Sequence, residues 1–155
     1  MKHPASIMIW GCVSSYGRGA LVILEKNVRM NSKIYTDMLE TKLKTFMGIH
    51  QCTSFMQDSA PCHVARSSLE WFRKNAIELL EWPGNSPDCN PIENIWTILK
   101  KRVSLRRPTS IAELKEAIKS VWDTEITDEL CKACVNSMPK RLEAIIKAHG
   151  GPTKY

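Results

Sequence analysis

Two acidic residues stand where a carboxylate could bind a metal ion. Asp58 follows an apolar run and precedes a turn, and Glu93 falls in the first turn of a predicted helix, with thirty-four residues between them. Carboxylate oxygens are preferred ligands of Mg²⁺, and acids on separate rigid elements can position metal ions for phosphodiester chemistry. Asp58 and Glu93 are therefore candidates for a pair of acids that bind Mg²⁺.

Each acid also has a purely structural explanation, which stays open at this point. Asp58 precedes Ser59-Ala60-Pro61 and could only shape a turn, as could Asp88 in a later loop. Glu93 is the third helical residue after Asn90 and could be the returning half of a capping interaction. What favours a shared site is that strand ends in α/β sheets commonly bind ligands, and that Pro91 would hold Glu93 in place.

The first half of the chain alternates predicted strands and helices. A strand at 6–13 and a returning strand at 20–25 form a hairpin around a turn at 14–19. Asn31 is expected to cap a helix that buries Tyr35, Met38, Leu39, Leu43 and Phe46 and ends at Gly48. The remaining elements are a strand at 52–57, a helix at 63–75 with Leu69, Trp71 and Phe72 as anchors, a strand at 77–82 and a proline-rich loop at 83–91.

The second half is predicted to be helical. Asn90 caps a helix with Pro91 at its first position, where the missing N–H costs nothing. Further helices begin at a capping box, Ser110 to Glu113, and at Thr127. The last helix is expected to carry the apolar residues Leu142, Ile145 and Ile146 and to end at Gly150-Gly151. This order predicts a mixed α/β sheet flanked by helices, followed by a helical C-terminal part.

Composition and charge narrow the classes of protein. At 155 residues the chain fits a single domain, 1–155, and no apolar run approaches the ~20 residues that span a bilayer. The net charge is +6, and a basic cluster follows Glu93; such a cluster can bind DNA or simply form a solvated helix face. The residues of this predicted DNA-binding cluster are Lys100, Lys101, Arg102, Arg106 and Arg107.

The six cysteines do not suggest a disulfide framework, because the chain is not small and shows no secretion signal. Cys131 and Cys134 form a lone Cys-x-x-Cys, whereas a structural zinc site needs two such pairs or a pair with two spaced histidines. A buried pair on a helix is the interpretation that we favour.

Two motifs resemble a known family. The segments Gln57-Asp58-Ser59-Ala60-Pro61-Cys62-His63 and Ser86-Pro87-Asp88-Cys89-Asn90-Pro91-Ile92-Glu93-Asn94-Ile95-Trp96 resemble the second and third acidic motifs of Tc/mariner transposases with Asp-Asp-Glu triads. The thirty-four-residue gap matches that branch. Trp10-Gly11-Cys12, Met138-Pro139-Lys140-Arg141-Leu142 and the terminal Gly150-Gly151-Pro152-Thr153-Lys154-Tyr155 are similar to it as well.

The resemblance implies a ribonuclease-H-like fold and metal-dependent DNA cleavage and strand transfer. Asp58 and Glu93 would be the second and third acids of the triad, with Mg²⁺ or Mn²⁺ as the metal and no small-molecule cofactor. His63, Asp88, Asn90 and Pro91 would shape the site. The implied partners are DNA and a second copy of the chain, and the implied location is the nucleus, with no membrane.

The chain departs from the family at its start. The family's first aspartate lies on a strand before the segment that Lys2-His3-Pro4 resembles, and no acid occurs here before Glu25. We therefore expect a fold that lacks its first, central strand, with little or no cleavage activity. A binding module derived from a transposase, without catalysis, is the main alternative. Another metal-dependent nuclease of the same fold is the third.

Overall fold

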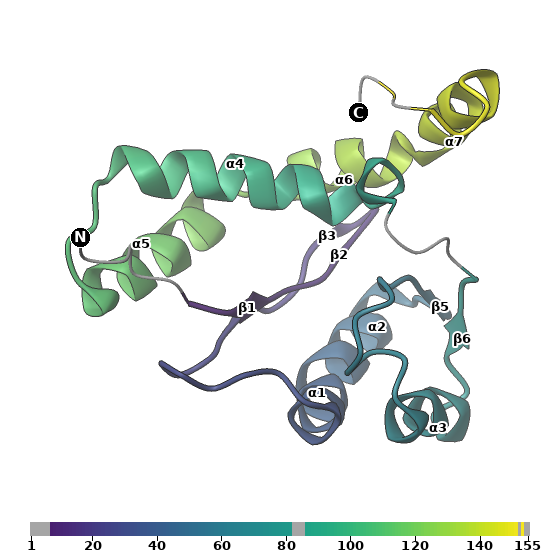
Figure 1. The fold of residues 1–155 in the computed structure, drawn as a ribbon, viewed down its shortest axis with the longest axis horizontal. Helices are drawn as coiled ribbons and strands as arrows, with labels where there is room; N and C mark the ends of the chain where they lie inside the picture. The colour runs from purple at the N-terminus through teal and green to yellow at the C-terminus, as the bar shows by residue number, and fades with distance from the viewer. Residues whose placement is uncertain (1–6, 82–85, 152, 154–155) are drawn as a thin grey trace. The chain divides into compact units, whose positions relative to one another are not determined.

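The computed structural model describes residues 7–81, 86–151 and 153, and the chain forms two compact units (Figure 1). The terminal unit consists of Met1–Lys26 and Pro87–Tyr155, and the middle unit is Asn27–Ser86. The single domain at 1–155 stays a prediction. Within the described residues, no helix is both long enough and apolar enough to cross a membrane.

The strands of the terminal unit form two short antiparallel pairs. β1 (Ile9–Trp10) pairs with β4 (Val22–Ile23), and β2 (Val13–Ser14) pairs with β3 (Gly17–Arg18). The predicted hairpin is confirmed, but its strands are shorter than predicted, and β3 occupies part of the predicted turn. Gly17 is needed there, because its φ is +148° and a Cβ would lie 2.4 Å from Oδ1 of Asp128.

The terminal unit also contains the helices of the predicted helical part. They are α4 (Pro91–Leu105), α5 (Ile111–Thr124), α6 (Asp128–Asn136) and α7 (Met138–Lys147), with a 3-10 turn η2 (Pro87–Cys89) before α4. Asn90, Ser110 and Thr127 each accept a hydrogen bond from a backbone N–H in the first turn of their helices. These predicted helix starts are confirmed, because the capping signal is local.

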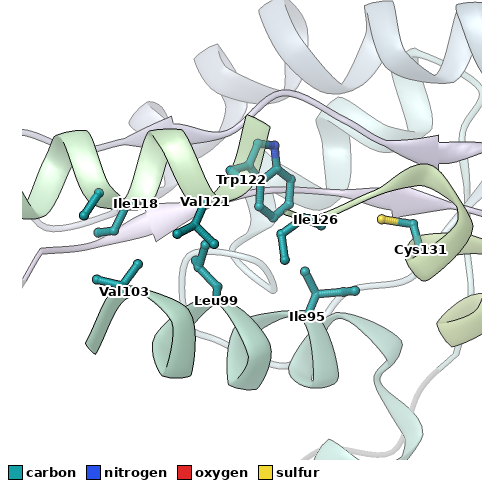
Figure 2. Close-up of a cluster of buried hydrophobic side chains, with 9 residues drawn as sticks. Ile95, Leu99, Val103, Ile118, Val121, Trp122, Ile126 and Cys131 are labelled. Atoms are coloured by element: carbon teal, nitrogen blue, oxygen red, sulfur yellow. The ribbon is translucent and has the colours of Figure 1, made fainter. Parts of the chain in front are cut away.

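The core of the terminal unit lies between α4 and α5 (Figure 2). Ile95, Leu99 and Val103 on α4 face Ile118, Val121 and Trp122 on α5. The ring of Trp122 stacks on Trp96 with centroids 5.5 Å apart, and its Nε1 donates to the carbonyl of Gly19 at 3.1 Å. A Cβ on Gly11 would lie 3.0 Å from each tryptophan ring, so glycine lets this strand segment approach the core.

The last helix, α7, exposes two of its apolar residues and buries an arginine. Leu142 and Ile146 are 41% and 73% exposed, whereas Arg141 is only 3% exposed and its Nε donates to Oγ of Ser137 at 2.7 Å. The sequence predicted a helix with these apolar residues but did not say which of its residues are buried. A helical period identifies residues that share a face, but it does not say which face packs against the rest of the unit.

The middle unit combines helices with a parallel strand pair. Its elements are α1 (Ser32–Met38), the π-helix η1 (Leu39–Leu43), α2 (Lys44–His50), β5 (Ser54–Phe55), α3 (Arg66–Lys74) and β6 (Glu78–Leu79). β5 pairs in parallel with β6, with α3 between them in the chain. This is the strand–helix–strand order that the sequence predicted, with each element shorter than predicted.

The helix that spans α1, η1 and α2 is continuous and contains a π-helical turn that the sequence did not predict. Asn31 caps it, as predicted, by accepting from the N–H of Ile34 at 2.9 Å. Its buried residues Tyr35, Leu39, Leu43 and Met47 are four positions apart. A strict α-helix has 3.6 residues per turn, so the wider π turn helps to keep this row on one face.

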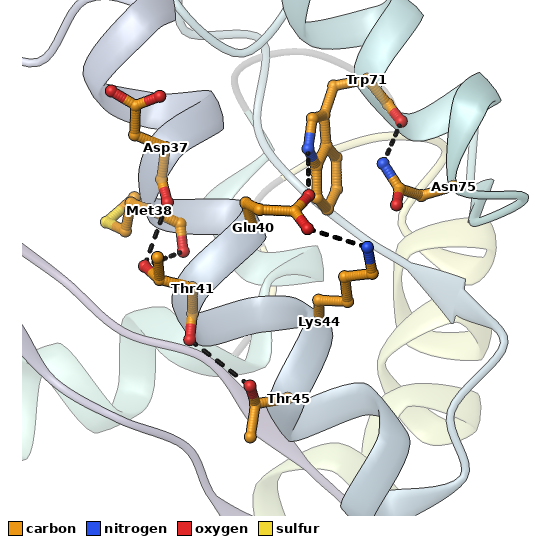
Figure 3. Close-up of polar contacts among 8 residues, drawn as sticks. All are labelled: Asp37, Met38, Glu40, Thr41, Lys44, Thr45, Trp71 and Asn75. Atoms are coloured by element: carbon orange, nitrogen blue, oxygen red, sulfur yellow. Dashed lines mark hydrogen bonds and ion pairs between the residues drawn. The ribbon is translucent and has the colours of Figure 1, made fainter.

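The end of this helix and one anchor of α3 were predicted wrongly. The helix continues through Gly48 and ends where Gln51 adopts the left-handed conformation, with its N–H donating to the carbonyl of Gly48. On α3, Phe72 is buried but Leu69 is 44% exposed. Figure 3 shows the polar contact that ties α3 to the π segment: Oε2 of Glu40 accepts from Nε1 of Trp71 at 3.0 Å.

Candidate metal and nucleic-acid site

Asp58 lies in the middle unit, three residues after β5 ends. Its Oδ1 accepts the N–H of Ala60 at 3.0 Å, so the predicted turn-forming role is confirmed. The same oxygen lies 2.5 Å from Nδ1 of His63, which acts as the donor if the carboxylate is ionised and can only accept. No partner of Oδ2 is found within the described residues, and the side chain is 59% exposed. Asp58 therefore forms a turn and still offers one oxygen to a ligand.

His63 is itself held by neighbouring side chains. Its side chain is 17% exposed, and its ring lies against that of Tyr35 with centroids 4.3 Å apart. Its carbonyl accepts from Nε2 of Gln57 at 3.1 Å, and Oε1 of Gln57 accepts from the hydroxyl of Tyr35 at 2.5 Å. From the sequence, His63 was expected near the site, but Tyr35 was expected only to fill the apolar core. The one sequence feature that could have pointed to these contacts is that Gln57 directly precedes Asp58.

Glu93 lies in the terminal unit, in the first turn of α4, where it is half-buried. The capping role considered for it is not formed: the N–H of Asn90 donates to the carbonyl of Pro87 at 2.9 Å. Within the described residues, no hydrogen bond or ion pair engages the carboxylate of Glu93. The backbone of Glu93 is fixed by its helix, and its carboxylate remains available.

The residues around Glu93 act as predicted on its backbone. Asn90 caps α4 through Oδ1, which accepts from the N–H of Ile92 at 3.3 Å, and Pro91 is buried at the first helical position. The side chain of Asp88 lies outside the described part of the chain. Its predicted role in shaping the site therefore stays a prediction.

The two acids lie in different units, so their convergence on one metal ion stays a prediction. Each nevertheless suits a hard divalent cation, because each presents carboxylate oxygen that the described residues do not engage. No group of three or more His, Cys, Asp or Glu side chains suited to a metal occurs in the part that the structure describes. Glu25, the first acid in the chain, is 77% exposed and pairs with Lys115 at 2.8 Å.

The predicted DNA-binding cluster divides into paired and unpaired cations. Arg102 and Arg106 both contact Glu125, at 3.4 Å and 2.7 Å. Lys100, Lys101 and Arg107 are exposed and make no ion pair with any residue that the structure describes. The unpaired cations can contact phosphates directly, whereas Arg102 and Arg106 must first break their ion pairs with Glu125.

The Cys-x-x-Cys pair lies on α6, as predicted. Cys131 is fully buried in the core of the terminal unit, and Cys134 packs beside it. Burial raises the pKa of the Cys131 thiol to about 11 and also raises the pKa of Cys134. Both therefore stay protonated near neutral pH, which suits packing better than metal ligation, because the thiolate is the metal-binding form.

Comparison with known proteins relates this chain to one group. Residues 2–115 match the DDE superfamily endonuclease family. The chain is 34% identical to the Caenorhabditis briggsae transposable element Tcb1 transposase, covering 100% of this chain and 57% of that protein. It is 36% identical to the Caenorhabditis elegans Tc3 transposase, covering 97% and 46%. The chain thus spans about half the length of these curated relatives.

Solved structures support the fold. The catalytic domain of Mos1 mariner transposase aligns with a TM-score of 0.83 at 19% identity, covering 99% of this chain and 78% of that one. A Mos1 paired-end complex with Mn aligns with a TM-score of 0.86 at 18% identity, covering 99% and 48%. The predicted ribonuclease-H-like α/β fold and the resemblance to Tc/mariner transposases are confirmed.

Proposed function

We propose that this chain, which belongs to the DDE superfamily endonuclease family, forms part of a transposase catalytic domain that cleaves DNA and transfers its strands. Its substrates would be DNA ends and target DNA, and a second copy of the chain would be its protein partner. Mos1 structures described as paired-end and strand-transfer complexes support the extension to DNA. Because its proposed substrate is chromosomal DNA, the nucleus is its proposed location.

The observation that carries this proposal is the state of the two acids. The side chain of Asp58 is 59% exposed and only its Oδ1 has a partner among the described residues. Glu93 lies in the first turn of a capped helix, and no described residue forms a hydrogen bond or ion pair with its carboxylate. A carboxylate oxygen that no protein donor engages is available to a divalent cation. Both lie in motifs inside the span that matches the family.

Asp58 and Glu93 would together hold Mg²⁺ or Mn²⁺, and Mos1 catalytic-domain structures with Mn and with Mg support this choice of metal. When bound, such ions activate the attacking oxygen and stabilise the charge on the scissile phosphate. The protein itself positions the two metal-binding carboxylates. The turn at Asp58 and the cap at Asn90 hold the two carboxylates, so little side-chain freedom is lost on binding.

DNA would lie along the basic side of α4. Lys100 is seven residues after Glu93, two helical turns along the same helix, and is exposed. With Lys101 and Arg107 it offers positive charge that no described acid neutralises, which suits contacts with phosphates. These contacts position DNA without reading its sequence.

The second candidate is a DNA-binding module without catalysis. The same unpaired cations favour it, because they need no metal to bind phosphates. It predicts that Lys100→Ala with Lys101→Ala weakens DNA binding and reduces its salt dependence, whether or not metal is present. Lys132→Ala, an exposed lysine on α6, is the matched control.

A plasmid-nicking assay distinguishes the two candidates. Supercoiled DNA is incubated with the chain and Mn²⁺, beside Asp58→Asn, Glu93→Gln and the exposed control Glu129→Gln. Catalysis by the two acids predicts nicking that EDTA stops, that both site variants lose and that the control keeps. Nicking that survives in both site variants would overturn the assignment of the acids. DNA binding without nicking would favour the module.

A further inference from the structure

We infer that Tyr35, acting through Gln57 and His63, is a positioning residue that fixes the carboxylate of Asp58 so that Oδ2 remains for a metal ion. The part of this inference that concerns a metal ion rests on the proposed function. The effect of Tyr35 on the side-chain rotamer of Asp58 does not. All four residues lie in the middle unit.

Asp58 needs external support because of where it lies. It is on a turn after a two-residue strand, and its side chain is 59% exposed. An exposed aspartate on a turn samples several rotamers, and ordering it for a ligand costs free energy. The hydrogen bond to the N–H of Ala60 holds Oδ1 from the backbone side. His63 holds the same oxygen, so Oδ2 is left without a partner among the described residues.

His63 can do this only if its own ring is held. The residue precedes α3 in a stretch without regular secondary structure, yet its side chain is only 17% exposed. The ring packs against Tyr35 at a centroid distance of 4.3 Å and a tilt of 33°. This contact limits rotation of the imidazole, so that Nδ1 keeps facing Asp58.

Gln57 ties the same tyrosine to the backbone of His63. Its side chain uses both ends: Oε1 accepts from the hydroxyl of Tyr35 at 2.5 Å, and Nε2 donates to the carbonyl of His63 at 3.1 Å. Gln57 is also the residue before Asp58, so it joins the end of the strand segment to the start of the α3 segment. Tyr35 thus holds His63 by two routes, through its ring and through its hydroxyl.

Tyr35 is a suitable anchor because it does not move with the turn. It is 0% exposed on α1, which is capped by Asn31 and continues into the π turn. Its row of buried neighbours, Leu39 and Leu43, is kept on one face by that turn. The π-helical turn therefore contributes indirectly to the geometry of Asp58. Outer partners of this kind commonly change metal affinity by about 10- to 100-fold when removed.

The test uses Tyr35→Phe, which keeps the ring and removes only the hydroxyl. Three-bond NMR couplings to Cγ of Asp58, measured without metal, report its χ1 rotamer. We expect one rotamer in the parent chain and averaging between rotamers in Tyr35→Phe. Trp71→Phe, which removes a hydrogen bond to Glu40 in the same unit, is the control and should leave Asp58 unchanged. An unchanged single rotamer in Tyr35→Phe would overturn the inference.

Calorimetric titration with Mn²⁺ gives the second readout. Tyr35→Phe is expected to weaken binding about tenfold in the parent background and to have no further effect in His63→Ala, because its action passes through His63. An equal loss in both backgrounds would mean a general structural role and would overturn the inference. Absence of Mn²⁺ binding in the parent chain would contradict the proposed function, and the NMR couplings would still decide the role of Tyr35.

Discussion

The two units hold their candidate acids by different physical means. In the middle unit, Asp58 sits on an exposed turn and is held by side-chain hydrogen bonds that reach back to Tyr35. In the terminal unit, Glu93 sits on a helix whose position is set by burial of Ile95 and Leu99. The first arrangement depends on single polar atoms, and the second depends on apolar packing. Single substitutions should therefore affect the two acids in different ways.

The largest effect is expected from the core beneath α4. Leu99→Ala should lower the free energy of unfolding of the terminal unit by about 2–5 kcal/mol, since Leu99 is 2% exposed and its loss leaves a cavity. Leu105→Ala is the matched control on the same helix, because Leu105 is 67% exposed and should change stability by less than about 0.5 kcal/mol. Urea unfolding, followed by the indole NMR signal of Trp122, measures both. Equal effects would show that packing does not hold α4.

A smaller effect is expected from the cap of the same helix. Asn90→Ala removes the acceptor for the N–H of Ile92 and should cost about 0.5–2 kcal/mol of unfolding free energy. It should also fray the turn that carries Glu93, which faster amide exchange at Glu93 and Asn94 would reveal. Asn94→Ala, inside the helix, should lack both effects. Unchanged exchange in Asn90→Ala would mean that the cap does not position Glu93.

The smallest expected effect is a change in the pKa of a surface carboxylate, and it is compared for one carboxylate in each unit. The hydrogen bond from the Lys44 ammonium, with that from Trp71, lowers the pKa of Glu40. The Thr109 N–H and hydroxyl lower the pKa of Glu113. Added salt screens an exposed ionic contact but not one to a neutral N–H. The pKa of Glu40 should therefore rise toward its ordinary value in 1 M salt, while that of Glu113 stays low.

Carboxylate NMR shifts during a pH titration measure this difference. Because the pKa of each carboxylate is lower in the folded state than in the unfolded state, each carboxylate stabilises its unit at pH values above its unfolded-state pKa. This stabilisation is lost as pH falls through the folded-state pKa. Salt should remove more of this acid-sensitive stabilisation for Glu40 than for Glu113. Equal salt responses would contradict the assignment of these contacts.

The sequence predicted the features that depend on near neighbours. The caps at Asn31, Asn90, Ser110 and Thr127 were predicted because an N-cap and its partner lie two or three residues apart. The end at Gln51 was missed, because Gly48 was a stronger local signal for a helix end than a glutamine that adopts a left-handed conformation. The burial of Arg141 on α7 was not predicted, because the sequence pattern does not say that Arg141, rather than Leu142, faces inward.

The candidate site was predicted only in part, again because the sequence shows near neighbours but not contacts between distant residues. Asp58, Glu93 and His63 stand in short motifs, so their types and spacing were visible. The bond between Tyr35 and Gln57 joins residues 22 positions apart, and no local pattern reports it. The pairing of Arg102 and Arg106 with Glu125 is similarly distant in sequence and divides a cluster that looked uniform.

Calorimetric titration of Mn²⁺ tests the central proposal, that Asp58 and Glu93 bind one metal ion. The parent chain would be compared with Asp58→Ala, Glu93→Ala and the double variant. If the acids share a site, each single variant loses most of the binding and the double variant is no worse than either, because the effects of residues in one site are not additive. If only one acid matters, or if the two losses add independently, the two carboxylates do not hold a common metal ion.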